Sequence, residues 1–173
     1  KNIRDELMNN FTIILPARKG SKGFPKKNRY LFDYTANQIP SNLSKHVVVT
    51  TDDEHILNRA KDYNFQIIER SEKLSKDDTS MRLVIKDVAD QLNINPNHDL
   101  ITLYLTYPQR TWLQVEEIYK FYKKKNARSL LCKKNLQDHP YLCFYKNGSK
   151  GRKIVKHDLY RRQEYPECFQ ASH

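Results

Sequence analysis

Short apolar runs alternate with amphipathic segments along most of this chain, and that alternation restricts its fold more than any other feature. The run FTIILPA at 11–17 is apolar and contains a proline near its end, as is typical of a strand buried on both faces of a parallel sheet. We predict further strands at 46–51, 65–70, 100–105 and 129–132. The strands are short, and the intervals between them are long enough for helices, which indicates a mostly parallel α/β sheet.

Amphipathic helices are predicted between these strands. The clearest occupies 81–92, where apolar residues recur with the i, i+3, i+4, i+7 spacing. Another is expected at 54–63, capped by Asp52 or Asp53, and a third after the capping-box spacing of Thr and Gln at 111–114. Helices on both faces of the sheet would give a three-layer, Rossmann-like α/β fold.

The pattern changes near 138. The segment YLCFYKNGSKGRKIVKH places Asn147 and Gly148 between two β-prone runs, which is a strong short-range indication of a hairpin. We therefore predict a hairpin element within 138–165. A chain of 173 residues without an internal repeat or a Gly/Ser linker otherwise suits a single domain over 1–173.

Composition excludes several classes of protein. The mean hydropathy is -0.84, and no apolar run approaches the length of a membrane span. The first ten residues, KNIRDELMNN, are charged and lack the apolar centre of a secretory signal, so we expect a cytoplasmic protein. The cysteines, Cys132, Cys143 and Cys168, are odd in number and lack metal-ligand spacing, which predicts free thiols and no zinc site.

The net charge of +11 gathers in the C-terminal third of the chain. Such a surplus suits nucleic acid, an anionic small molecule or an acidic partner, but charge alone favours a solvated surface. Because no nucleic-acid-binding module is recognisable, we do not expect nucleic acid as the partner.

The turn after the first strand, ARKGSKGFPKKN at 17–28, is the strongest candidate for a ligand site, because ligands bind beyond the carboxyl ends of the strands in open parallel sheets. Gly20 and Gly23 allow a close approach of the backbone and a positive φ, so that the amides between them can point at phosphate oxygens. Lysine and arginine side chains here add charged contacts. The alternative is a solvent-facing turn with incidental lysines.

The glycine spacing of this loop fits neither the dinucleotide-binding fingerprint nor the Walker loop, which disfavours a kinase or a P-loop ATPase. The residues themselves therefore predict an anion or nucleotide site without specifying a reaction.

The same loop, ILPARKGSKGFPKKN, resembles the motif P-A-R-x-G-S-K-G-x-P-x-K-N of the acylneuraminate cytidylyltransferases, the CMP-sialic acid synthetase family. Further segments are similar to that family's motifs in the same order along nearly the whole chain: VVVTTDDEHI, ERSEKLSKDDTS, LYLTYPQRT, DHP and RRQEYPECF. In the 29–49 interval the chain is shorter than usual for the family, which indicates a compact variant.

The resemblance implies the nucleotide-diphospho-sugar transferase fold and a homodimer whose dimerisation element is 138–165. It implies transfer of CMP from CTP to a sialic acid-like acidic sugar, a nonulosonic acid, with release of pyrophosphate and with Mg²⁺ as cofactor. The family's metal-binding Asp pair lies in a segment beyond the last residue of this chain, so we expect the domain to be incomplete at its C-terminus and leave the metal ligands unassigned.

Carried over by motif, one group of residues is expected to bind the nucleotide: Arg18, Gly20, Ser21, Lys22, Gly23, Lys27, Asn28 and Arg70. Arg18 and Lys22 are the catalytic candidates, because the triphosphate needs its charge neutralised. A second group is expected on the sugar side: Ser80, Tyr104, Arg110 and Arg162. Alternatives stay open here, namely a helix cap for Ser80, a loop brace for Arg110 and surface charge for Arg162.

Three departures from the family concern the sugar. Tyr104 stands in place of a sugar-contacting Gln, Met81 in place of a Ser, and Gln170 in place of a second Arg that reaches the partner subunit. The identity of the sugar is therefore left open. These changes also motivate an alternative function, a catalytically weakened homologue that binds nucleotide or sugar in a regulatory role.

Overall fold

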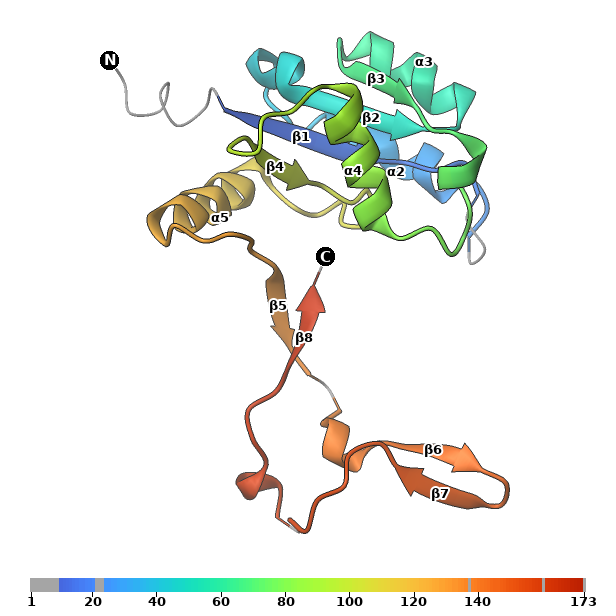
Figure 1. Ribbon diagram of the computed structural model, residues 1–173, viewed down its shortest axis with the longest axis vertical. Helices are drawn as coiled ribbons and strands as arrows, with labels where there is room; N and C mark the ends of the chain where they lie inside the picture. Colours follow the sequence, from blue (N-terminus) through green and yellow to red (C-terminus); the bar gives the residue numbers. More distant parts are fainter. Residues whose placement is uncertain (1–9, 21–23, 137, 160, 173) are drawn as a thin grey trace. The chain divides into compact units, whose positions relative to one another are not determined.

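The computed structural model describes residues 10–20, 24–136, 138–159 and 161–172 (Figure 1). They fall into two compact units, the first ending at Phe121 and the second beginning at Tyr122. No helix in the described ranges is long and apolar enough to cross a membrane.

A four-stranded parallel sheet forms the centre of the first unit. Its strands are β1 (Phe11–Pro16), β2 (Val47–Thr51), β3 (Gln66–Glu69) and β4 (Asp99–Thr102), in the order β3-β2-β1-β4. The central strands β1 and β2 are buried along their whole length, as expected for apolar runs covered on both faces. The predicted parallel α/β sheet is confirmed.

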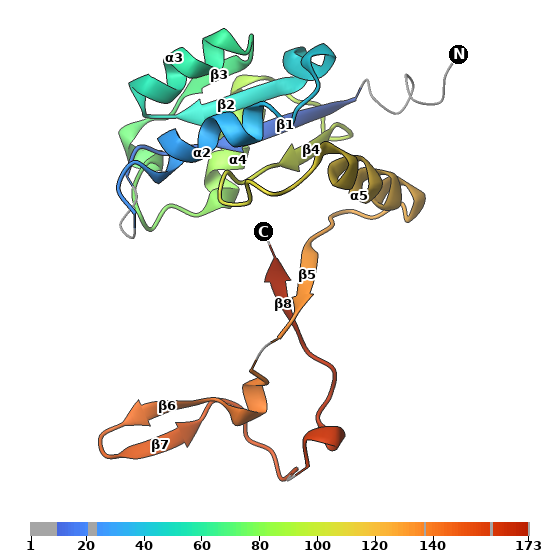
Figure 2. The same ribbon diagram turned by 180° about the vertical axis from the view of Figure 1, so that it is seen from behind.

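Helices cover both faces of this sheet. They are α2 (Lys27–Ala36), α3 (Glu54–Asp62), α4 (Met81–Gln91) and α5 (Trp112–Lys124), together with short 3₁₀ turns η1 (Ser41–His46) and η2 (Glu72–Leu74). In Figure 1, α4 crosses the near face of the sheet, and Figure 2 shows α2 in front of the opposite face.

Two apolar clusters separate the layers. On one face, Val88 of α4 packs with Ile14 and Val48 of the central strands. On the other face, residues of α2, α3 and α5 pack with the alternate side chains of the same strands, Ile13 and Val47 among them. Adjacent residues of a strand point to opposite faces, so β1 and β2 supply both clusters. The three-layer prediction is confirmed.

Helix caps follow the local sequence. Asp53, rather than Asp52, caps α3, and its carboxylate accepts the backbone N–H of His55. Ser80 caps α4, where its hydroxyl oxygen accepts the N–H of Leu83. The capping box at 111–114 is present in both directions.

Helix α2 was not anticipated from the sequence. It is a polar helix that buries Phe32, Thr35 and Ala36, and the aromatic residues on its exposed side hide this narrow apolar stripe in the sequence pattern. The predicted strand at 100–105 ends earlier, at Thr102.

The second unit consists of two antiparallel strand pairs. Strand β5 (Cys132–Asn135) pairs with β8 (Phe169–Ser172), and β6 (Phe144–Asn147) forms a hairpin with β7 (Lys150–Lys153). The predicted hairpin is confirmed. The strand expected at 129–132 was misplaced: β5 begins where that segment ends, and its partner is antiparallel β8 rather than a strand of the parallel sheet. Gly148 in the hairpin turn has a φ of 59°, which favours glycine.

None of the described residues of this unit is buried. Two histidines and two tyrosines nevertheless form a cluster of ring contacts in it. His139 and His157 each make contact with the rings of Tyr141 and Tyr165. Each imidazole Nδ1 accepts a backbone N–H, and each Nε2 lies 2.9 Å from a backbone carbonyl oxygen to which it must donate. Each ring thus uses Nδ1 as the acceptor and Nε2 as the donor in this arrangement.

Candidate functional site

The carboxyl ends of β1, β2 and β3 lie side by side, because Pro16 is in register with Thr50, and Thr51 with Glu69. The chain leaves these strands at charged residues, Arg18 after β1, Asp52 after β2 and Arg70 after β3. This edge of the sheet is where the loop motif was expected to form an anion site, and it is the position at which open parallel sheets bind ligands.

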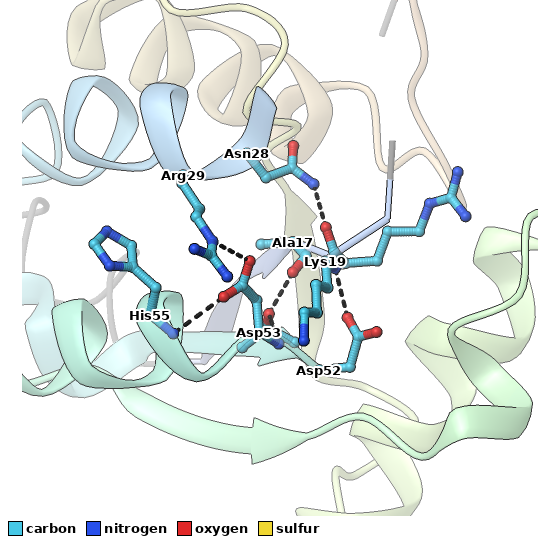
Figure 3. A network of polar contacts seen from close by, with 9 residues as sticks. Ala17, Lys19, Asn28, Arg29, Asp52, Asp53 and His55 are labelled. Carbon is cyan, nitrogen blue, oxygen red and sulfur yellow. Dashed lines mark hydrogen bonds and ion pairs between the residues drawn. The ribbon is translucent and has the colours of Figure 1, made fainter. Parts of the chain in front are cut away.

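Three side chains hold the backbone of residues 17–19 at the start of the loop (Figure 3). At the end of β2, the Thr51 hydroxyl donates to the carbonyl of Ala17, and the Asp52 carboxylate accepts the N–H of Lys19 at 2.6 Å. From α2, the side-chain amide of Asn28 donates to the carbonyl of Arg18 at 2.8 Å. We call Thr51, Asp52 and Asn28 the loop frame. It fixes where the loop leaves the sheet.

Asp52 serves this frame through a hydrogen bond, so its two simplest variants should differ. Asp52→Asn keeps an acceptor for the Lys19 N–H, whereas Asp52→Ala removes it. Because Lys19 is exposed, we expect its amide to exchange with solvent at least about tenfold faster in Asp52→Ala, and much less so in Asp52→Asn. NMR hydrogen exchange measures both, and equal rates in the two variants would contradict the frame.

Behind the frame lies an ion pair. Asp53 is only 1% exposed, and its carboxylate accepts Arg29 Nε of α2 at 2.8 Å. Its own backbone N–H donates to the Thr51 hydroxyl at 3.0 Å, which links the pair to the loop frame. Burial alone would raise the pKa of the Asp53 carboxyl, but the bonds from Arg29 and the His55 N–H outweigh burial and lower it. Asp53 is therefore ionised and joins α2 to the end of β2 (Figure 3).

Arg70 is a buried cation at the same edge. It is 5% exposed and donates through Nη2 to the carbonyl of Thr50 at 2.8 Å. Burial lowers the pKa of its guanidinium, and the charge of nearby Asp52 opposes that change. Since an arginine stays protonated in proteins, a positive charge is fixed beside the loop frame. The nucleotide contact expected for Arg70 stays a prediction.

Arg18 forms an ion pair with Asp77, through Nη1 and Oδ1. Asp77 lies in the loop between η2 and α4, which follows β3 along the chain. Both side chains keep partial exposure, 29% for Arg18 and 38% for Asp77. The sequence offered no indication of this pairing, because 58 intervening residues must fold before the two groups meet.

The centre of the loop motif, Ser21, Lys22 and Gly23, lies outside the described residues. One expectation for Gly20 is wrong, since its φ is not positive, and a Cβ added there would meet nothing within 4 Å. The described backbone therefore does not itself require glycine at position 20. Lys27 begins α2, which has neither a side-chain N-cap nor an acidic residue in its first turn.

The residues expected on the sugar side have structural partners. Ser80 caps α4, and Arg110 Nη2 donates to the carbonyl of Tyr104 at 3.2 Å, which braces the loop after β4. Burial raises the pKa of the Tyr104 hydroxyl. Arg162 belongs to the second unit, where it begins the 3₁₀ turn η4 (Arg162–Glu164) and is exposed. The sugar contacts of these residues stay predictions.

No group of three or more His, Cys, Asp or Glu side chains that could hold a metal occurs in the described part of the chain. Asp52, the acidic residue closest to the loop backbone, already accepts a hydrogen bond from it. Because Mg²⁺ that is bound with a nucleotide usually takes only one or two protein carboxylates, we assign it no ligand among the described residues.

Comparisons with known proteins agree with this fold. The cytidylyltransferase family model matches residues 12–171. N-acylneuraminate cytidylyltransferase of Streptococcus agalactiae serotype III (strain NEM316) is 28% identical over 163 residues, and the match covers 87% of this chain and 39% of that protein. The serotype V (strain ATCC BAA-611 / 2603 V/R) protein of the same name is 25% identical over 138 residues, covering 75% of this chain and 33% of the relative. The chain thus spans less than half the length of these relatives.

Among solved structures, CMP:2-keto-3-deoxy-manno-octonic acid synthetase complexed with CTP is similar with a TM-score of 0.53 and 19% identity, over 69% of this chain and 49% of that one. At this identity the likeness concerns the fold alone. The family model, in contrast, covers nearly the whole chain and includes both units. The chain belongs to the cytidylyltransferase family.

Proposed function

We propose that this chain is part of a cytoplasmic CMP-sugar cytidylyltransferase that binds CTP and transfers CMP to a sialic acid-like acidic sugar. The observation that carries the proposal is the framed loop at the carboxyl edge of the sheet, with Arg18 at its start and the buried cation of Arg70 beside it. A preorganised backbone with fixed positive charge suits a triphosphate better than a neutral ligand.

In the proposed reaction the anomeric hydroxyl of the sugar attacks the α-phosphorus of CTP. A new P–O bond forms, the bond to the β-phosphate oxygen breaks, and pyrophosphate leaves. Arg18 and Lys22 would neutralise the charge that develops on the phosphate oxygens, with the other loop residues Gly20, Ser21 and Gly23 next to the triphosphate. Mg²⁺ is included as the usual counter-ion of such transfers, and none of the described residues is assigned to it.

The acidic sugar is the finer part of the proposal. It is supported by the names of the curated relatives, which specify N-acylneuraminate. Arg110 is proposed to contact the sugar, with Ser80 and Tyr104 as its neighbours, and Arg162 is proposed to meet the sugar carboxylate in the site of the partner subunit.

Pyrophosphate release tests the function directly. The protein is incubated with CTP, Mg²⁺ and a panel of acidic sugars, with neutral hexoses as the control. We expect release with at least one acidic sugar and none with the neutral sugars. CTP binding without turnover on any sugar would instead support the alternative, a nucleotide-binding regulatory homologue.

We also propose a homodimer that forms through the hairpin element, 138–165. The second unit exposes large apolar side chains, with Phe144 at 68% and Ile154 at 58%, and it has no buried residue among those described. Such a surface suits a second copy of the chain. Light scattering after size-exclusion chromatography should give twice the chain mass, and Phe144→Glu should shift it toward the monomer. A monomer at all concentrations would refute the dimer.

A further inference from the structure

We propose that Asp77 is a positioning residue for Arg18, which it holds in the orientation that receives the triphosphate of CTP. This inference rests on the proposed function, because it concerns how the same site is organised. Its starting point is the ion pair between Arg18 Nη1 and Asp77 Oδ1. A guanidinium carries five N–H donors, so pairing with one carboxylate leaves donors for a phosphate.

The other end of the Arg18 side chain is also fixed. Asn28 bonds to the carbonyl of Arg18, and Asp52 bonds to the N–H of the next residue. A long arginine side chain normally loses much rotamer freedom when it binds a ligand. With its backbone held by the loop frame and its tip paired with Asp77, Arg18 has lost part of that freedom before CTP arrives, which favours binding.

The loop that carries Asp77 has supports of its own. The Ser75 hydroxyl donates to the carbonyl of Ser71 at 3.0 Å, and the Thr79 hydroxyl donates to the carbonyl of Lys73 at 3.3 Å. The loop then ends at Ser80, the N-cap of α4. These bonds support the shape of the loop that presents Asp77 to Arg18.

A carboxylate beside Arg18 could instead oppose the ligand, by competing for the guanidinium and repelling the phosphates. The two roles predict opposite changes in CTP affinity when the charge of Asp77 is removed. If Asp77 positions Arg18, removing its charge weakens CTP binding. If it competes with the phosphates, removing its charge strengthens binding.

Calorimetric titration with CTP and Mg²⁺ separates these roles. We expect Asp77→Asn to raise the Kd for CTP about tenfold, the size of one well-placed charge-assisted contact. Asp77→Glu, which keeps the charge, should recover part of that loss. The matched control is Asp78→Asn, because Asp78 is the exposed neighbour in the same loop and should change Kd less than about twofold.

The Arg18→Ala background distinguishes a positioning role of Asp77 from a merely structural one. In that background, Asp77→Asn should cause no further loss of CTP affinity, since the group it positions is gone. An unchanged or lower Kd for Asp77→Asn, or an equal loss with and without Arg18, would overturn the inference while leaving the proposed function intact. If the unsubstituted protein bound no CTP, both would fail.

Discussion

Arg18→Ala should lower kcat/KM for CTP at least about 100-fold, with little change in thermal stability. Removing one charged donor that acts on developing phosphate charge costs about that much in related chemistry. The side chain is partly exposed, and its ion pair with Asp77 lies near the surface. A pair of this kind contributes little to stability, so Tm should move by less than about 3 °C.

Initial rates of pyrophosphate release measure this effect, and the melting curve is recorded on the same samples. Lys19→Ala is the matched control, because Lys19 enters the site through its backbone N–H, which the substitution keeps. It should retain most of the activity. If both variants lost activity equally, the loop would need positive charge in general rather than Arg18 in particular.

Asp53→Ala is expected to have the largest effect on stability among the charged residues near the site. Asp53 is buried, caps α3, and accepts Arg29 from α2. Loss of the N-cap alone costs about 1 kcal/mol, and the loss of the link between α2 and β2 adds to it, so the free energy of unfolding should fall by more than that. Glu54→Gln, at the exposed next position, should cost less.

Urea unfolding followed by tryptophan fluorescence measures this difference. The chain contains one tryptophan, Trp112, which packs against the larger apolar cluster of the first unit and therefore reports on the sheet. A midpoint for Asp53→Ala equal to that of Glu54→Gln would show that the buried pair does not hold α2 to the sheet.

The same carboxyl gives the stability an acid dependence of defined sign. The pKa of Asp53 is lowered in the folded state relative to about 3.9 in an unfolded chain. Its contribution is therefore complete above about pH 4 and is lost as the pH falls through the lowered value. The urea midpoint should decline over that acid range, and Asp53→Asn should flatten the decline.

The sequence predicted those parts of the fold that local pattern determines. The apolar runs that became β1 and β2, a cap of α4 at position 79 or 80 and the Asn147–Gly148 hairpin all follow from neighbouring residues. Helix α2 escaped prediction because its buried stripe is narrow and its outer face carries tyrosines. The pairing of β5 with β8 joins distant segments, and local pattern contains no information on such partners.

The candidate site was likewise predictable only in part. Its place was predictable, because a basic, glycine-containing loop follows the first buried strand. Its internal organisation was not, since the contacts of Lys19 with Asp52 and of Arg18 with Asp77 form only after three strands are in register. Asp53 was recognisable as a helix cap, but its partner Arg29 lies in the helix that the pattern did not reveal.

The antiparallel pair of β5 and β8 also affects the order in which the protein can fold during its synthesis. The four described strands of the parallel sheet have left the ribosome once Thr102 has emerged, so the first unit can begin to fold while the rest of the chain is being made. Strand β5 emerges next but has to wait for Phe169–Ser172. During that interval the backbone edge of β5 is unpaired, and an unpaired edge of this kind can pair with a strand of another chain.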